Sequence, residues 1–194
     1  MTTATIAPPW TPTDREFHRF SVDDYHRMGD VGIFPHKTRV HLLEGLIVWK
    51  WPPWGHTTML GDQYRFSVDQ YHRLADAGIL TKKDRVVLLE GLLVRKMTIH
   101  PPHAKALERC YKRLLFLLAS IGWTVRGQQP ITLAACEPEP DVSVARGSDD
   151  DYGARHPRPA DLGLVIEVAD SSLRVDRVDS ARQFAEAGIP VYWI

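Results

Sequence analysis

The apolar residues of the chain gather in short runs, and the residues between the runs mark where each element begins and ends. Two pairs of apolar runs are each interrupted by Glu-Gly. The first pair is Arg39–Leu43 with Leu46–Val48, and the second is Arg85–Leu89 with Leu92–Arg95. Runs of this length around a two-residue turn that contains glycine predict β-hairpins. The first half of the chain is therefore expected to hold two hairpins.

A short helix is predicted ahead of each hairpin, over Val22–Asp30 and Val68–Ala77. Each helix follows a serine suited to N-capping, has an acidic residue in its first turn and stops before a glycine. The capping residues are Ser21 and Ser67, and the glycines are Gly32 and Gly78.

The two helix–hairpin segments are copies of one another. The stretch RFSVDDYHRMGDVGIFPHKTRVHLLEGLIVWK (19–50) returns as RFSVDQYHRLADAGILTKKDRVVLLEGLLVRK (65–96), and about two-thirds of the aligned positions are identical. Between them lies a Trp-, Pro- and Gly-rich stretch, whose chemistry is typical of a linker. We expect residues 1–18 to form a flexible N-terminus, 19–50 a partial duplicate helix–hairpin module, 51–63 a linker and 64–194 the main domain.

After the second copy, the pattern changes to a long helix followed by short strands. Apolar residues at helical spacing predict a helix over His103–Ser120. A further helix is expected over Arg177–Ala187, before a final strand at Ile189–Ile194. Strands mixed with helices in this order indicate an α/β domain. The predicted intervening strands are Thr124–Arg126, Ile131–Leu133, Asp141–Ala145 and Leu162–Val168.

Composition narrows the functional classes. The chain has 194 residues, and its 24 Lys and Arg balance its 24 Asp and Glu, which excludes a strongly basic protein that coats DNA but allows a local basic groove. Its two cysteines, Cys110 and Cys136, give no disulfide framework and no zinc-ligand spacing. Residues 1–12 lack the features of a secretory signal, and no apolar run is long enough for a bilayer, so we expect a cytoplasmic protein without a membrane partner.

Two acidic residues occupy places where a carboxylate is costly. Asp141 enters a predicted strand, and Glu167 interrupts an apolar one. A carboxylate in such a place needs an ion pair, hydrogen bonds or a metal ion. Two acids on adjacent strands would suit Mg²⁺, which is held by one or two carboxylates plus water and phosphate oxygens. From the residues alone, a structural role remains open, with Asp141 ending a turn and Glu167 paired with a basic neighbour.

Six stretches together resemble the restriction endonucleases of the Uma-two family, in the PD-(D/E)xK nuclease superfamily. They are FSVDQYHRLADAGIL, DRVVLLEGLLV, PPHA, EPEPDVSVAR, LVIEVADSSLRVDR and FAEAGIPVYWI, and they cover 66–194 in the family's order. The resemblance implies a restriction-endonuclease-like mixed β-sheet flanked by helices. It also implies a Mg²⁺- or Mn²⁺-dependent endonuclease acting on DNA, with Asp141 and Glu167 as metal ligands. A homodimer is common among such nucleases, but no residue here indicates an interface.

The chain departs from the family pattern at the catalytic lysine. The place two residues after Glu167 is Ala169, and the place on the following helix is Ser180. Serine is neutral and short and cannot replace an ammonium. Arg177, one helical turn earlier, could supply charge but not a base. These departures favour an alternative, a catalytically decayed nuclease fold that binds DNA or protein.

The roles of His103 and Glu90 are left open by the sequence. His103, at the start of the long helix, either contacts a phosphate or assists the metal site, or it only lies near a helix start. Glu90 is either an accessory metal ligand or an exposed turn residue. His26 and His72, which are repeat-related, are expected to pack the helix–hairpin module. The family usually continues beyond the last residues seen here, so a C-terminally truncated product is also expected.

Overall fold

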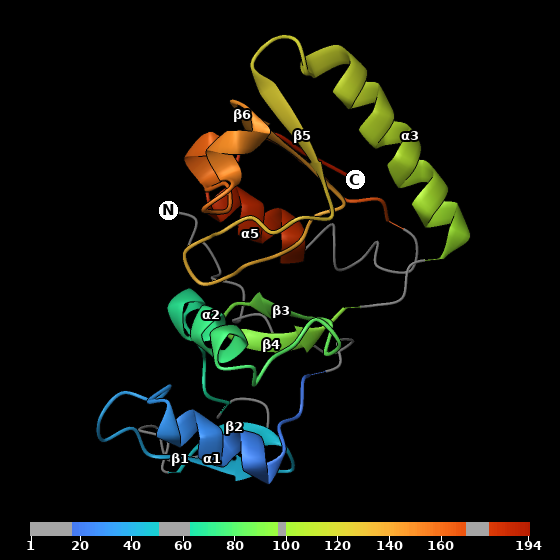
Figure 1. Cartoon of the computed structure of the whole chain (residues 1–194). Helices are drawn as coiled ribbons and strands as arrows, with labels where there is room; N and C mark the ends of the chain where they lie inside the picture. The colour runs from blue at the N-terminus through green and yellow to red at the C-terminus, as the bar shows by residue number, and fades with distance from the viewer. Residues whose placement is uncertain (1–16, 51–62, 97–99, 170–178) are drawn as a thin grey trace, which may run out of the picture.

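The computed structural model describes residues 17–50, 63–96, 100–169 and 179–194. Three layers follow one another along the chain in Figure 1: two small helix–hairpin units, and then a four-stranded sheet with helices beside it. The fold is a mixed α/β fold, as the sequence predicts. No helix in the described segments combines the length and the apolarity needed to cross a membrane.

The first two units have the same elements in the same order. Helix α1 (Val22–Asp30) precedes strands β1 (Val40–Leu43) and β2 (Leu46–Trp49). Helix α2 (Val68–Asp76) precedes β3 (Val86–Leu89) and β4 (Leu92–Arg95). These bounds agree with the predicted helices and hairpins to within two residues.

The helix starts and hairpin turns follow from local chemistry. Ser21 and Ser67 each accept a hydrogen bond from the backbone three residues later, where Asp24 and Gln70 complete capping boxes. Glu90 and Gly91 both have positive φ, at 47° and 78°, as the tight turn of a hairpin requires. A Cβ on Gly91 would lie 2.7 Å from the Cβ of Arg65, so this position also needs glycine for space.

The two units are joined by an exchange of backbone pairing. Phe17, ahead of the first unit, pairs with Val94 of β4, and Gln63, ahead of the second unit, pairs with Val48 of β2. Each unit therefore receives an extra strand position from the segment that precedes the other unit.

A pair of arginines repeats this exchange between the helices. Arg27 of α1 donates to the carbonyl of Ala77, and Arg73 of α2 donates to the carbonyls of Val31 and Gly32. Each guanidinium thus satisfies carbonyl groups at the C-terminus of the other helix, where positive charge is favourable. The two units also share one apolar core, which includes Phe20, Met28, Ile33, Ile47, Phe66, Leu74, Ile79 and Leu88.

The main sheet has the order β5–β6–β7–β8, formed by β5 (Trp123–Gly127), β6 (Val142–Arg146), β7 (Leu162–Ile166) and β8 (Tyr192–Trp193). The first three strands are antiparallel, and β8 is parallel to β7. Two short 3₁₀ helices, Asp149–Tyr152 and Pro159–Asp161, lie in the loop from β6 to β7.

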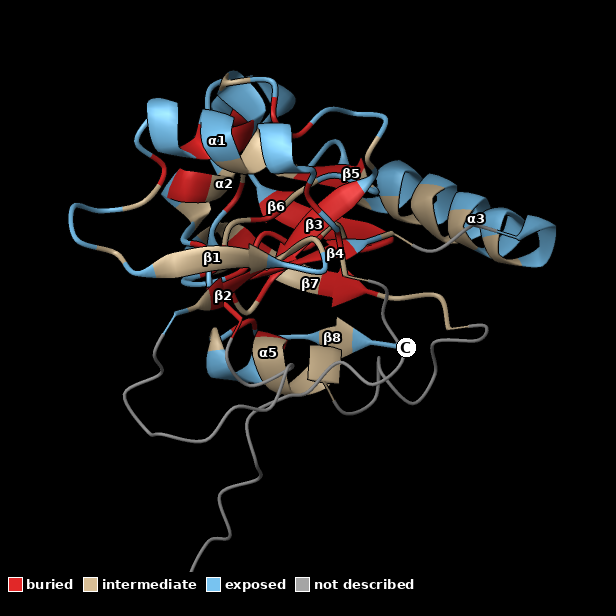
Figure 2. Ribbon diagram, turned by 90° about the horizontal axis from the view of Figure 1, so that it is seen from below, coloured by how far each residue is buried: buried red, intermediate tan, exposed pale blue. Residues whose placement is uncertain are grey.

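A helix packs against each face of this sheet. Helix α3 (Pro101–Leu118) packs on Val125, Val142 and Val144, whereas α5 (Ala181–Glu186) inserts Phe184 beside Ala145 on the other face. Because neighbouring residues of a strand point to opposite faces, Val144 and Ala145 belong to different cores. Helix α3 has no completely buried residue, and Figure 2 draws it in the exposed and intermediate colours.

One predicted strand, Ile131–Leu133, is not a strand in the structure. The backbone of Ile131 and Leu133 instead bonds to the carbonyls of Pro138 and Cys136, so the segment folds back on its own continuation. The two side chains are buried, and their alternation with Thr132 therefore reports burial in a folded loop rather than pairing in a sheet.

Candidate active site

The two acids singled out in the sequence lie at the same end of the main sheet. Asp141 directly precedes β6, and Glu167 directly follows β7. These strands are antiparallel, with Val142 opposite Ile166, so the start of one meets the end of the other. The topology therefore brings together two residues that are 26 positions apart.

Reciprocal hydrogen bonds hold the two acids beside one another. The backbone N–H of Asp141 donates to Oε2 of Glu167 at 3.2 Å, and the N–H of Val168 donates to Oδ2 of Asp141 at 2.8 Å. Each carboxylate is thus fixed by the backbone of the other strand.

The remaining oxygen of Asp141 is held from two other elements. Nε2 of His103, in the first turn of α3, lies 2.9 Å from Oδ1, and the side-chain amide of Gln128 donates to the same oxygen at 3.3 Å. The Asp141 side chain is only 10% exposed, and the His103 side chain is 16% exposed. The carboxylate is therefore hydrogen-bonded through both oxygens and largely shielded from water.

The other predicted site residues lie on and around α5. Ser180 lies at the start of α5 and is half-buried, and no side-chain capping bond is formed there. Glu90 lies in the β3–β4 turn and forms an ion pair with Arg182 of α5, at 2.7 Å between Nη2 and Oε1. Glu90 is thus tied to α5 rather than left in an open turn. Arg177 lies outside the described residues.

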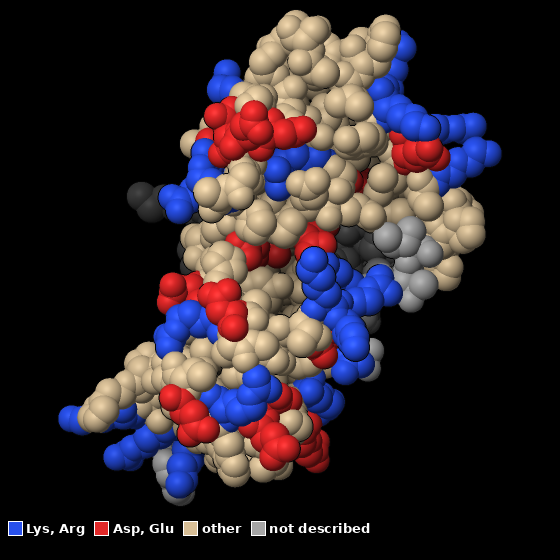
Figure 3. All heavy atoms as spheres, in the orientation of Figure 1, with Lys and Arg blue, Asp and Glu red and all other residues tan. Residues whose placement is uncertain are grey.

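Exposed basic side chains line one side of α3. Figure 3 shows Lys and Arg side chains along α3 and a second group of them lower on the same side of the molecule. The exposed basic residues of the helix are Lys105, Arg109, Lys112 and Arg113. Lys112 pairs with Glu108 on the same helix, so part of this charge is locally balanced.

A further acid in the same segment was not predicted from the sequence. Glu139, two residues before Asp141, forms an ion pair with Lys96 at 2.5 Å. The alternation of acids in Glu137-Pro138-Glu139-Pro140-Asp141 is visible in the sequence, and its period of two places three carboxylates along one extended segment.

The first acid of that segment, Glu137, lies in a second cluster with His72 and His156. Burial lowers the pKa of His156, with Glu137 opposing the shift and Arg126 adding to it. Burial, with smaller contributions from Glu137 and Glu139, raises the pKa of Tyr71 to about 12, so this hydroxyl stays protonated and donates to the Val86 carbonyl.

Both cysteines of the chain are free. Burial raises the pKa of the Cys110 and Cys136 thiols, which lowers the fraction of reactive thiolate. Neither has the environment of a nucleophile.

A mixed α/β domain with two braced acids at the ends of adjacent strands has the architecture of a restriction-endonuclease-like nuclease. The comparison with family models makes this specific. The model of the Uma2 (Uma-two) family, described as "Putative restriction endonuclease", matches residues 68–194, and the chain belongs to this family. Comparison with curated proteins gives no match.

The match begins at the first residue of α2, so it covers the second helix–hairpin unit and the main sheet. The first unit lies outside the matched region. The resemblance stated from the sequence is therefore confirmed at the level of the family, and a nuclease of the restriction-endonuclease-like class is the function that the family supports.

Proposed function

We propose that the chain is an endonuclease that hydrolyses DNA phosphodiester bonds with the help of a divalent cation, held by Asp141 and Glu167. The observation that carries the proposal is the reciprocal brace between these acids, which fixes two carboxylates side by side at the ends of β6 and β7. Restriction-endonuclease-like families generally use divalent metals, and DNA is the substrate that the family implies.

The donor set fits a hard cation. Both candidate ligands supply carboxylate oxygens, the donors that Mg²⁺ and Mn²⁺ prefer. One of them belongs to a side chain that is only 10% exposed, and a buried carboxylate is stabilised by a nearby positive charge. A bound Mg²⁺ would neutralise charge on a phosphodiester and activate water there.

The surrounding residues have positioning roles in this proposal. His103 and Gln128 fix one oxygen of Asp141, while the Val168 N–H fixes the other. The exposed cations of α3 would contact DNA phosphates, which gives affinity that falls with salt. Glu90 is bound to Arg182, and its proposed role is to anchor α5 rather than to act as a metal ligand.

A second candidate function is a nuclease fold that has lost catalysis and binds DNA or another protein. The identity of Ser180 favours it, because this place carries a lysine in the family pattern and a hydroxyl supplies neither a positive charge nor a base at neutral pH. Ala169 likewise offers no cation two residues after Glu167.

Nicking of supercoiled plasmid by the full chain separates the two candidates. The reactions contain Mg²⁺ or Mn²⁺, with EDTA as the metal-free arm, and compare wild type, Glu167→Ala, Ser180→Lys and the control Asp150→Asn, which changes an exposed acid in the loop after β6. We expect nicking by wild type that Asp150→Asn retains and Glu167→Ala reduces at least 100-fold.

Nicking only after Ser180→Lys would instead support the decayed nuclease. Calorimetric titration with Mn²⁺ gives an independent reading of the metal proposal. Asp141→Ala is expected to weaken Mn²⁺ binding at least tenfold, and an unchanged affinity would refute Asp141 as a ligand.

A further inference from the structure

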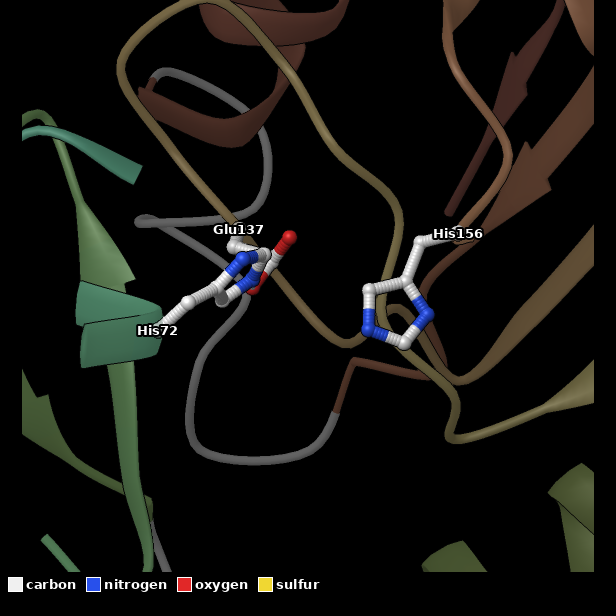
Figure 4. Close-up of side chains that lie close together, drawn as sticks. All are labelled: His72, Glu137 and His156. Carbon is white, nitrogen blue, oxygen red and sulfur yellow. The ribbon is translucent and has the colours of Figure 1, made fainter. Parts of the chain in front are cut away.

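The structure holds a second cluster of metal-ligating groups, away from the paired acids. His72 comes from α2, Glu137 from the segment before β6, and His156 from the loop between the two 3₁₀ helices. One ligand atom from each residue lies within 4.8 Å of the others. Figure 4 shows His72 and Glu137 meeting side by side, with His156 facing them from the opposite loop.

Glu137 is the buried centre of this cluster. Its side chain is only 3% exposed, and its Oε2 lies 2.7 Å from Nε2 of His72. Its other oxygen accepts a hydrogen bond from the Thr132 hydroxyl at 2.7 Å. A buried carboxylate is costly unless it is hydrogen-bonded, paired or bound to a metal ion. The Thr132 bond fixes its orientation, as outer groups do for carboxylates that bind metals.

The three donors form the set that zinc uses. Two imidazole nitrogens with one carboxylate oxygen leave a fourth tetrahedral position for water, and the ligands lie roughly 2.0–2.2 Å from the ion. The His72 side chain is 49% exposed, so solvent reaches this position. Imidazole favours Zn²⁺ and similar transition metals, whereas the all-carboxylate pair of Asp141 and Glu167 favours a harder cation.

The sequence repeat provides an internal control for His72. His26 occupies the same place in α1, where it is exposed. The repeat covers 19–50 and 65–96 only, so the first unit has no counterpart of Glu137 or His156. Among the described residues, a histidine at this helix position meets a ligand set in the second unit and not in the first.

We propose that His72, Glu137 and His156 bind one transition-metal ion of the Zn²⁺ type, separate from the cation of the proposed nuclease site. The bound ion joins α2 to the loops on either side of β6. It therefore stabilises the docking of the second helix–hairpin unit on the main sheet.

The test is titration of the metal-free full chain with Zn²⁺ by calorimetry, with Co²⁺ absorption as a direct report of coordination. All measurements are made in Asp141→Asn protein, which removes one ligand of the proposed nuclease site. We expect one equivalent of Zn²⁺ to bind and to raise Tm. His72→Ala and His156→Ala are expected to weaken binding at least tenfold, whereas His26→Ala leaves it unchanged.

Circular dichroism shows whether each variant is folded, and His72→Gln, at a half-exposed position, serves as a second variant if His72→Ala is not. The proposal is overturned if Zn²⁺ does not saturate at one equivalent, or if folded His72 and His156 variants bind as tightly as their parent. It is equally overturned if His26→Ala weakens binding as much as His72→Ala. These outcomes are independent of nicking, so either proposed metal site can fail while the other stands.

Discussion

The two helix–hairpin units are identical at about two-thirds of their aligned positions but have different surroundings. Every residue of β3 is buried, whereas no residue of β1 is fully buried. The hydroxyls of Tyr25 and Tyr71 donate to the matching carbonyls of Val40 and Val86, at 2.9 and 3.0 Å, so the internal geometry is the same. The difference lies in what each hairpin meets on its outer side.

The second unit is held by the main domain, and the first unit is held by the second. The backbone N–H of Glu137 donates to the Leu88 carbonyl, and the N–H of Gly91 donates to that of Ala135. The repeated sequence specifies the same local fold in both units, whereas the burial of each hairpin depends on which part of the protein packs beside it. Matched substitutions in the two units can therefore separate these contributions.

The largest difference is expected at a matched pair of leucines. Leu88 is 0% exposed, and Leu42, its counterpart in β1, is partly buried. We expect Leu88→Ala to lower the free energy of unfolding by about 2–5 kcal/mol, since it leaves a cavity. Leu42→Ala removes less buried surface and should cost about 1–2 kcal/mol. Urea unfolding followed by circular dichroism measures both, and equal losses would contradict the difference in burial.

A smaller difference is expected at the hairpin turns. Glu90 pairs with Arg182, while Glu44, at the same place in the first unit, is exposed. Glu90→Gln should cost up to about 1 kcal/mol, because the pair is partly exposed, and Glu44→Gln close to nothing. The difference should shrink in 1 M salt. A Glu44 effect as large as that of Glu90 would show that the turn itself, rather than Arg182, uses the carboxylate.

The smallest expected effect is on how stability depends on pH, through the segments that precede the two units. His18 is the counterpart of Tyr64, and each donates its backbone N–H to the other unit's hairpin. Burial lowers the pKa of His18 below 6.5. Asp84 and Asp24 oppose this shift, whereas Arg95 adds to it. The unfolded chain therefore binds this proton more readily than the folded chain.

The contribution of neutral His18 to the free energy of unfolding is thus fully present above pH 6.5. It is lost as the pH falls through the pKa that His18 has in the folded chain, which is lower. His18→Tyr makes the two segments alike and should reduce the loss of unfolding free energy on acidification. The measurement is urea unfolding at a series of pH values from neutral downward. Parallel curves for wild type and variant would count against His18 as the titrating group.

The sequence predicted local elements well because their signals are local. The capping serines and the Glu-Gly turns specify the helices and hairpins without reference to the rest of the chain. The end of the last helix was also predicted, within one residue of Glu186. The prediction of a strand at 131–133 was wrong, because the alternation of apolar and polar residues there reflects burial in a folded loop.

The candidate site could be predicted only in part. Asp141 and Glu167 stood out because an acid in an apolar run is costly, and His103 was suggested by the resemblance. Gln128 carries no such signal, and its contact with Asp141 depends on how β5 turns towards β6. The cluster of His72, Glu137 and His156 was also missed, because its members lie 65 and 19 positions apart and no short spacing marks them.

The reciprocal contacts of Arg27 and Arg73 affect how the protein responds to dilution. Arg27 and Arg73 each bind the helix end of the other unit, in the reciprocal manner of two identical subunits. Here both partners belong to one chain, so the effective concentration of one for the other is set by the linker and not by the amount of protein. A symmetric dimer would separate on dilution, but this pairing keeps the same docked population at nanomolar and at micromolar protein.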